Sequence, residues 1–262
     1  MTSDAVRLPG APWVWFDLDD TLWDFTANSL TALTEMYHRR GLRRWWPTLQ
    51  MWLDAYHAVN AALWQRYNRG EIDTATLRTQ RFRLTFLGAG YSDGDILQLS
   101  RQLDEEYLYT LSGLPDLVPG AREVLERMRP NYNIGVLSNG FRDTQPRKLQ
   151  SGGIDGLVDA MVLSDTIGIN KPDRRIYDHA LRLSQATAAD TVMVGDNPET
   201  DIGGALRAGW AAVWFDTAGR DLSLVDADST RLARVDSLDR VDAAVAMLLR
   251  HPCGPENSRN KA

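Results

Sequence analysis

The sequence contains a single cysteine, Cys253, in 262 residues. One thiol excludes an internal disulfide and a metal site built from several thiolates, and this scarcity is typical of a reducing compartment. The start of the chain lacks an apolar signal segment, and no apolar run approaches the length of a membrane span. We therefore expect a cytoplasmic protein that has no membrane partner.

The sequence also lacks a concentration of positive charge. Its net charge is −6, and its lysines and arginines are spread along the chain. A nucleic-acid polymer is not an expected partner, because proteins that bind one gather cations on one face. The four histidines are too scattered to suggest a metal cluster, and nothing specifies an oligomeric state. The length suits one large domain or two smaller ones.

An apolar, aromatic-rich run at residues 13–16 is followed by three acids, Asp17, Asp19 and Asp20. The run predicts a buried strand. In open α/β sheets ligands bind beyond the carboxyl ends of the strands, so we expect Asp17 and Asp19 to lie in a reactive crevice. The alternative is an acidic loop that only caps a helix.

Helical periodicity dominates the next stretch, which we expect to form an inserted domain over residues 25–113. One helix is predicted at residues 29–39, and Thr48 and Asp73 are the expected caps of two more. Ser92 and Asp95 predict the start of a fourth helix. Four helices of this size can pack as a small bundle.

After residue 113 strands and helices alternate. The pattern predicts an α/β fold, a doubly wound, Rossmann-like parallel sheet formed by residues 1–24 and 114–262, with residues 252–262 as a disordered tail. The expected elements beyond the first strand are strands at residues 134–137, 161–163, 191–194 and 212–215, and helices at 121–128, 174–183, 200–208 and 237–249.

The first acidic cluster has the residues that phosphoryl transfer needs. Asp17 can act as a nucleophile that forms an aspartyl-phosphate, and Asp19 can protonate the leaving oxygen and later activate water. Thr21 is expected to hold Asp19 in place and to take part in binding the phosphate.

Three further clusters follow predicted strands or precede helices. Ser138 and Asn139 offer hydrogen bonds for phosphoryl oxygens, and Lys171 offers a cation that can neutralise charge on the transferred group. Taken alone, the Ser-Asn cluster is more typical of an ordinary turn, and the Lys-Pro pair is more typical of a surface loop. Asp196 and Asp201 can complete a magnesium site with Asp17, because Mg²⁺ prefers a few carboxylates together with phosphate and water.

Taken in order, Asp-x-Asp-x-Thr, Ser-Asn, Lys-Pro and Gly-Asp-x-x-x-x-Asp resemble the four motifs of haloacid dehalogenase-like hydrolases. The resemblance implies a magnesium-dependent phosphatase with a helical cap between the first two motifs. It implies that Asp17 is the nucleophile and Asp19 the acid and base, and that Ser138 and Lys171 bind phosphate. It also implies metal ligation by Asp196 and by the backbone carbonyl of Asp19, with Asp201 as a ligand or a neighbour of the ligands.

Within that superfamily the first motif, with Ala-Asn-Ser at residues 27–29, resembles the noncanonical pyrimidine nucleotide 5′-nucleotidases. Further matches include Leu63-Trp64-x-x-Tyr67 and Ser138-Asn139-Gly140-Phe141 with Gln145. The resemblance implies a nucleoside 5′-monophosphate as substrate. Alternatives are a phosphoglycolate or sugar-phosphate phosphatase and a 2-haloacid dehalogenase. Asp19 argues against the dehalogenase because a halide needs no proton, and Asp196 argues against it because the resemblance implies no metal-binding Gly-Asp in dehalogenases. The presence of every motif acid argues against an inactive binding protein.

Substrate specificity is expected to come from the helical block, because the four motifs contact only the phosphoryl group. Trp23, Trp64, Tyr67 and Arg81 are the candidates for contact with the leaving group. Trp64 and Tyr67 are three residues apart on a helix, so they can stack on a planar base together, but filling the cap core is an equally good interpretation.

Overall fold

The computed structural model describes residues 7–90, 93–221 and 230–250, with the side chains of residues 93–95 not described. Its centre is a six-stranded sheet in the order β3-β2-β1-β4-β5-β6, in which every neighbouring pair is parallel. The predicted doubly wound α/β fold is therefore confirmed. The strands are β1 (Trp13–Phe16), β2 (Asn133–Ser138), β3 (Ala160–Leu163), β4 (Thr191–Gly195), β5 (Ala211–Phe215) and β6 (Leu232–Val235).

Strand β1 lies at the middle of the sheet, between β2 and β4. Its last residue, Phe16, is in register with Val136 of β2 and Val194 of β4. The residues that follow these positions therefore emerge at one edge of the sheet. This register is what places the acidic run after β1 beside the polar ends of β2 and β4.

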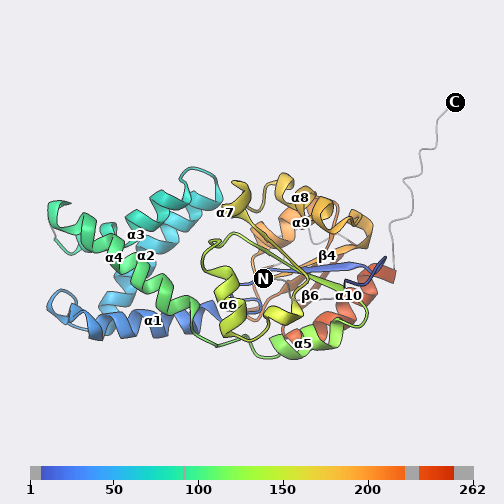
Figure 1. Ribbon diagram of the computed structural model, residues 1–262, viewed down its shortest axis with the longest axis horizontal. Helices are drawn as coiled ribbons and strands as arrows, with labels where there is room; N and C mark the ends of the chain where they lie inside the picture. The colour runs from blue at the N-terminus through green and yellow to red at the C-terminus, as the bar shows by residue number, and fades with distance from the viewer. Residues whose placement is uncertain (1–6, 91–92, 222–229, 251–262) are drawn as a thin grey trace.

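Side chains alternate across β1, as expected for a strand that is buried on both faces. Val14 and Phe16 belong to one apolar cluster, and Trp13 and Trp15 to the other. Helices α5 (Ala121–Met128) and α10 (Val241–Arg250) cover the first face, whereas α8 (Arg174–Ser184) and α9 (Gly204–Arg207) cover the second (Figure 1).

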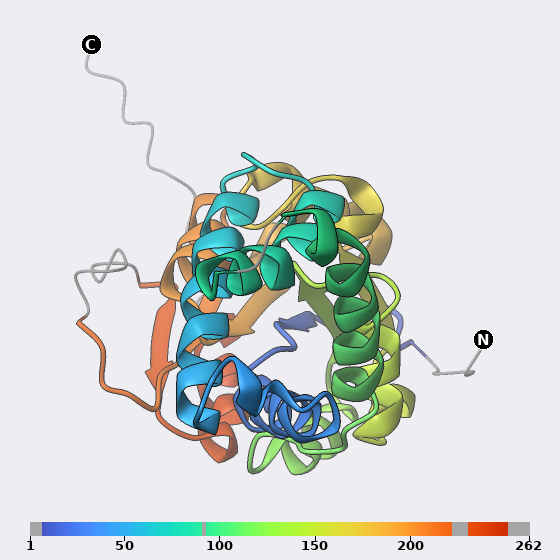
Figure 2. The same ribbon diagram turned by 90° about the vertical axis from the view of Figure 1, so that its left-hand side faces the viewer.

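Four helices form a block beyond one end of the sheet (Figure 1), and they lie in front of the strands in the end-on view of Figure 2. Thr48 and Asp73 accept hydrogen bonds from the backbone N–H groups of Met51 and Thr76, so both predicted caps are confirmed. The predicted cap Ser92 lies outside the described residues. The helices are α1 (Phe25–Arg39), α2 (Leu49–Asn68), α3 (Thr74–Gly88) and α4 (Asp93–Ser112), with a 3₁₀ turn at Leu42–Arg44.

Aromatic rings fill the centre of this helical block. The rings of Trp46 and Trp52 have centroids 4.9 Å apart, and Trp52 stacks on Phe82 at 6.2 Å. Tyr56 and Phe86 are buried in the same cluster. The block thus has a core of its own, and we propose that it acts as a cap over the edge of the sheet where the acids emerge.

The two chain segments that connect the helical block to the sheet are tied to each other. Asp24 ends the first segment and caps α1 through a bond from the N–H of Ala27 (2.8 Å). The side-chain amide of Asn28 donates to the carbonyls of both Asp24 (2.8 Å) and Asp116 (2.9 Å). The start of α1 is therefore fixed to both of the segments that connect the helical block to the sheet.

Some predicted elements differ in the structure. The first helix begins at Phe25 because Asp24 caps it, four residues before the expected start. Residues 200–208, predicted as one helix, form a π-helical turn at Pro198–Gly203 followed by α9. The expected cap Ser237 instead bonds the carboxylate of Asp239 and precedes a 3₁₀ turn at Leu238–Arg240.

Strand β6 was not predicted, because it is a short edge strand of mixed polarity without an apolar run. The expected tail at residues 252–262 lies outside the described residues. Within the described part of the chain, no helix has both the length and the apolar character required to span a bilayer.

Candidate active site

A cavity of about 240 Å³ lies where the carboxyl ends of β1, β2 and β4 meet the helical block. Asp17 follows β1 directly, and its backbone N–H donates to the carbonyl of Val194 on β4 (2.8 Å). The lining combines acids, amides and one ammonium from the sheet with aromatic and amide side chains from the helical block. It comprises Asp17, Asp19, Asp20, Phe25, Asn60, Trp64, Asn68, Ser138, Asn139, Gly140, Lys171, Asp196, Asn197 and Thr200.

A tight turn carries the first acids into this cavity. The carbonyl of Leu18 accepts from the N–H groups of both Leu22 and Trp23 (2.9 Å each). Asp20 adopts a left-handed backbone conformation (φ 57°), which aspartate tolerates better than most residues, and its carboxylate accepts from the N–H of Thr26 (2.9 Å). This turn presents Asp17 and Asp19 on the same side of the chain.

Thr21 does not make the contact that we predicted from the sequence. Its hydroxyl accepts from the backbone N–H of Asp196 (3.1 Å), and its side chain is fully buried outside the cavity lining. It therefore connects the first motif to the fourth instead of holding Asp19 or contacting phosphate, because the turn directs it toward β4.

Lys171 is the central cation of the site. Its ammonium donates to Asp17 Oδ1 (2.8 Å), to Asp201 Oδ1 (2.7 Å) and to the carbonyl of Leu137 (2.8 Å). Burial disfavours the charge on Lys171, but the two carboxylates outweigh that effect and raise the pKa of the ammonium above its ordinary value. Lys171 therefore connects Asp17 to Asp201 and to the end of β2.

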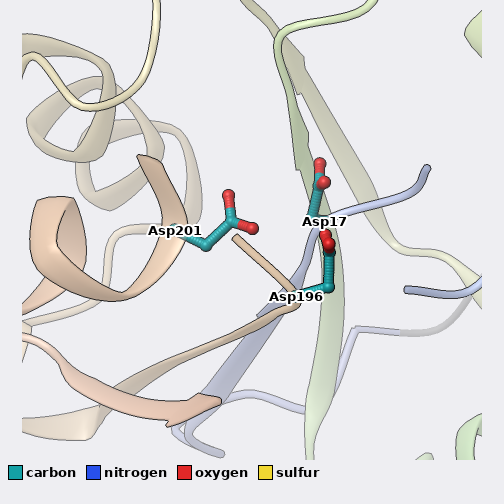
Figure 3. Close-up of side chains that lie close together, drawn as sticks. All are labelled: Asp17, Asp196 and Asp201. Atoms are coloured by element: carbon teal, nitrogen blue, oxygen red, sulfur yellow. The ribbon is translucent and has the colours of Figure 1, made fainter. Parts of the chain in front are cut away.

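Asp17, Asp196 and Asp201 offer oxygens that all lie within 4.8 Å of one another (Figure 3). Burial, with the repulsion of neighbouring carboxylates, raises the pKa of Asp17 to about 7 despite Lys171, and raises that of Asp196 to about 8. Carboxylates in this arrangement are suited to a hard divalent cation, which would let them ionise together.

The three acids have different surroundings. Asp17 and Asp196 line the cavity, whereas Asp201 is fully buried behind it and accepts from Lys171 and from the N–H of Asn197 (3.0 Å). A Cβ on Gly195 would lie 2.3 Å from Asp201 Oδ2, so glycine is required for this close approach. Asp17 and Asp196 are thus the acids best placed to ligate a metal, and Asp201 supports Lys171 from behind.

Ser138 and Asn139 line the cavity beyond the end of β2. The hydroxyl of Ser138 accepts from Gly140 N–H (3.1 Å) and from the side-chain amide of Gln145 (2.7 Å). The amide group of Asn139 bonds both the N–H (2.8 Å) and the carbonyl (3.0 Å) of Lys171. Asn139 therefore also fixes the loop that carries the lysine.

Sequence reasoning missed Lys148, on helix α6 (Gln145–Ser151). Its ammonium lies 2.6 Å from Asp19 Oδ1, and the amide of Gln145 donates to Asp19 Oδ2 (3.0 Å). The chain contains only three lysines, and two of them, Lys148 and Lys171, are buried against acids of the first motif. Two features of the sequence could have indicated Lys148: the scarcity of lysine, and its spacing of three residues from Gln145, which places both on one helix face.

Of the four specificity candidates, the structure places only Trp64 on the cavity. Trp23 is fully buried, and its indole N–H donates to the carbonyl of Leu114 (3.2 Å). Tyr67 is buried with its hydroxyl 3.3 Å from that of Ser164. Arg81 is buried in an ion pair with Asp104 (2.6 Å). These three side chains are used in packing, and Phe25, Asn60 and Asn68 were missed in their place.

Comparison with known proteins agrees with the motif geometry. Residues 13–209 match the family model described as haloacid dehalogenase-like hydrolase. The chain belongs to this family. Its structure is similar to that of the putative HAD-hydrolase YfnB from Bacillus subtilis bound to magnesium, with a TM-score of 0.78, 21% identity and coverage of 90% of this chain and 99% of that one.

Two of the relatives with similar sequences illustrate the activities that their names specify. The pyrimidine 5′-nucleotidase YjjG of Escherichia coli (strain K12) is 31% identical over 80% of this chain and 88% of its own length. The phosphoserine phosphatase of Thermus thermophilus is 30% identical over 88% of this chain and 98% of its own length. The family resemblance noted from the four motifs is confirmed.

Proposed function

We propose that this hydrolase is a magnesium-dependent phosphatase that cleaves small phosphate monoesters through an aspartyl-phosphate on Asp17. The observation that carries the proposal is the convergence of Asp17, Asp19, Lys171 and Asp196 on one small cavity. A nucleophile, a proton-transfer group, a cation and a metal-binding acid are the groups that such a reaction needs.

In the first half-reaction an oxygen of Asp17 attacks phosphorus, and the bond between phosphorus and the leaving oxygen breaks. Asp19 gives its proton to that oxygen, so the product leaves as a neutral alcohol. Lys171, 2.8 Å from Asp17, offsets negative charge on the carboxylate and on the phosphoryl group as they approach each other.

In the second half-reaction water attacks the phosphorus of the aspartyl-phosphate. Asp19, now ionised, accepts a proton from the water, and the bond between Asp17 and phosphorus breaks to release inorganic phosphate. Asp19 thereby regains the proton that it gave to the alcohol, and both carboxyl groups return to their starting state.

Asp17, Asp196 and the backbone carbonyl of Asp19 are the groups that would hold Mg²⁺, with Asp201 behind them. Bound there, the ion would supply positive charge for the acids and for the phosphoryl oxygens. The raised pKa values of Asp17 and Asp196 support this assignment, because each acid is hard to ionise without such a charge.

For the leaving group we propose a pyrimidine nucleoside 5′-monophosphate. Phe25 and Trp64 give the cavity aromatic walls suited to a planar base. Asn60 lines the same cavity, and its nearly buried Oδ1 has no hydrogen-bond partner among the described residues, so it can accept from a base N–H. The name of the relative YjjG supports this choice, whereas that of the Thermus relative favours a different ester.

Phosphate release from a panel of esters tests the proposal. We expect pyrimidine monophosphates to exceed phosphoserine, phosphoglycolate and hexose phosphates in kcat/KM by about 10-fold, the scale of a few lost contacts in a pocket. Activity should vanish in chelator and return with magnesium. A preference for one of the other esters would contradict the nucleotide assignment, and full activity in chelator would contradict the metal-dependent reaction.

Replacing Trp64 tests the aromatic wall. Trp64→Ala should narrow the preference for pyrimidine monophosphates while sparing p-nitrophenyl phosphate, because only the larger ester reaches the wall. Tyr109→Ala removes an exposed aromatic ring from the helical block and serves as the control. Because Trp64 also stacks on Phe141 with centroids 5.5 Å apart, the melting temperature of each variant is measured in parallel. Unchanged selectivity in folded Trp64→Ala would remove this residue from the substrate site.

A further inference from the structure

Asp19 makes two side-chain contacts that the reaction scheme above does not use. Lys148 Nζ lies 2.6 Å from its Oδ1, and Gln145 Nε2 lies 3.0 Å from its Oδ2. Both partners come from one face of α6, so a single helix holds both oxygens of the carboxylate. The same amide of Gln145 also donates to Ser138 Oγ (2.7 Å).

The side chain of Lys148 is buried beside Asp19. Its side chain is 5% exposed, against 28% for that of Asp19. The ammonium lies 4.7 Å from the ring centroid of Trp23 and 5.5 Å from that of Phe25, within range of cation–π attraction. Trp23 and Phe25 flank the segment that leads from the first motif into α1, so Lys148 is held by the same turn that positions Asp19.

A buried ammonium requires compensating contacts, because taking a charge out of water is costly. This chain uses arginine for nearly all its cations and has only three lysines. A compact ammonium can approach a single carboxylate oxygen, whereas the guanidinium fork of arginine demands more space and more partners.

We propose that Lys148 is the positioning residue of Asp19, holding its carboxylate in the orientation from which it transfers protons. The proposal rests on the proposed phosphatase function. Lys148 does not line the cavity, and of the groups in the proposed reaction it contacts Asp19 alone, so it acts through Asp19. It contributes to protonation of the leaving alcohol and to deprotonation of water, but not to binding of the phosphoryl group.

Lys148→Met tests this role, because methionine keeps a long apolar side chain over Trp23 and Phe25 but removes the charge. For an alkyl ester such as a nucleoside monophosphate, kcat/KM should fall by about 10- to 100-fold, part of the usual contribution of general acid catalysis. For p-nitrophenyl phosphate, whose leaving group needs no proton, kcat/KM should stay within about 3-fold. Since water activation also slows, a burst of one p-nitrophenol per enzyme should precede its steady state.

Two further variants separate positioning from structural damage. Arg147→Met removes a cation from the same helix that lies over Tyr109, outside the cavity, and should leave all rates unchanged. Lys148→Met added to Asp19→Asn should cause no further loss, because a residue that acts through Asp19 has nothing left to position. The inhibition constant of inorganic phosphate should be unchanged in Lys148→Met, and Lys148→Gln replaces that variant if it does not fold.

The outcomes distinguish this inference from the proposed function. Wild-type protein without phosphatase activity would overturn the function itself. If the wild type is active, three results would overturn only the role of Lys148. These are equal losses of kcat/KM on alkyl and aryl esters in Lys148→Met, the absence of a burst in that variant, and additive losses when Lys148→Met is combined with Asp19→Asn.

Discussion

Magnesium binding is predicted to displace protons from Asp17 and Asp196. Burial and mutual repulsion raise their pKa values to about 7 and about 8, so both carboxyl groups carry most of their protons in slightly acidic solution. A metal ion binds their ionised forms, and its binding must therefore release protons. At about pH 6.5 we expect between one and two protons per Mg²⁺, and about a 20-fold rise in association constant from pH 6.5 to 7.5.

The same pKa shifts make the stability of the metal-free protein depend on pH. Both folded pKa values lie above the ordinary 3.8, so the folded state binds more protons than the unfolded chain between about pH 4 and pH 8. Stability contributed by these groups is present below that window and is lost as the pH rises through it. Magnesium should therefore raise the melting temperature more at pH 8 than at pH 6.

Isothermal titration calorimetry measures the proton count directly, when the apparent binding enthalpy is compared among buffers of different ionisation enthalpy. At about pH 9 both acids are already ionised, and the count should fall toward zero, which provides an internal control. A count of zero at about pH 6.5, with an affinity independent of pH, would refute the reasoning.

Two substitutions test how the surroundings of the site are held. Asp104→Asn leaves Arg81 buried without its carboxylate partner at 2.6 Å. The free energy of unfolding, measured in urea, should therefore fall by about 3 kcal/mol. A loss below about 1 kcal/mol would contradict the importance of this buried ion pair. Gly195→Ala forces Asp201 away from Lys171 because the new Cβ lies 2.3 Å from its Oδ2, so phosphatase activity should fall at least about 10-fold. Gly156→Ala, whose Cβ meets no described atom within 4 Å, should have no effect, and equal activity of the two variants would exclude this steric argument.

Sequence patterns predicted which acids lie together at one edge of the sheet, because strand order and register alone bring them together. Asp17 and Asp196 each come directly or almost directly after a buried apolar strand, and parallel strands end at one edge. The spacing of the acids could therefore be interpreted without knowledge of side-chain packing.

The contacts that depend on tertiary packing could not be predicted in this way. Thr21 bonds Asp196, 175 residues away, and nothing in its own neighbourhood in the sequence distinguishes that partner from Asp19. Tyr67 and Arg81 have the chemistry to contact a ligand, but their helix faces turn toward Ser164 and Asp104. Lys148 was missed because its partner Asp19 lies 129 residues away in the chain.

Chemical trapping of the phosphoryl group on Asp17 tests the proposed reaction most directly. Enzyme mixed with magnesium and a pyrimidine monophosphate is quenched during turnover and treated with borohydride, which reduces an aspartyl-phosphate to homoserine. We predict homoserine at position 17 by mass spectrometry, its absence without substrate, and loss of turnover in Asp17→Asn, whose amide is not a competent nucleophile. Turnover that persists in Asp17→Asn, or a trapped phosphoryl group at another residue, would contradict the assignment of Asp17 as the nucleophile.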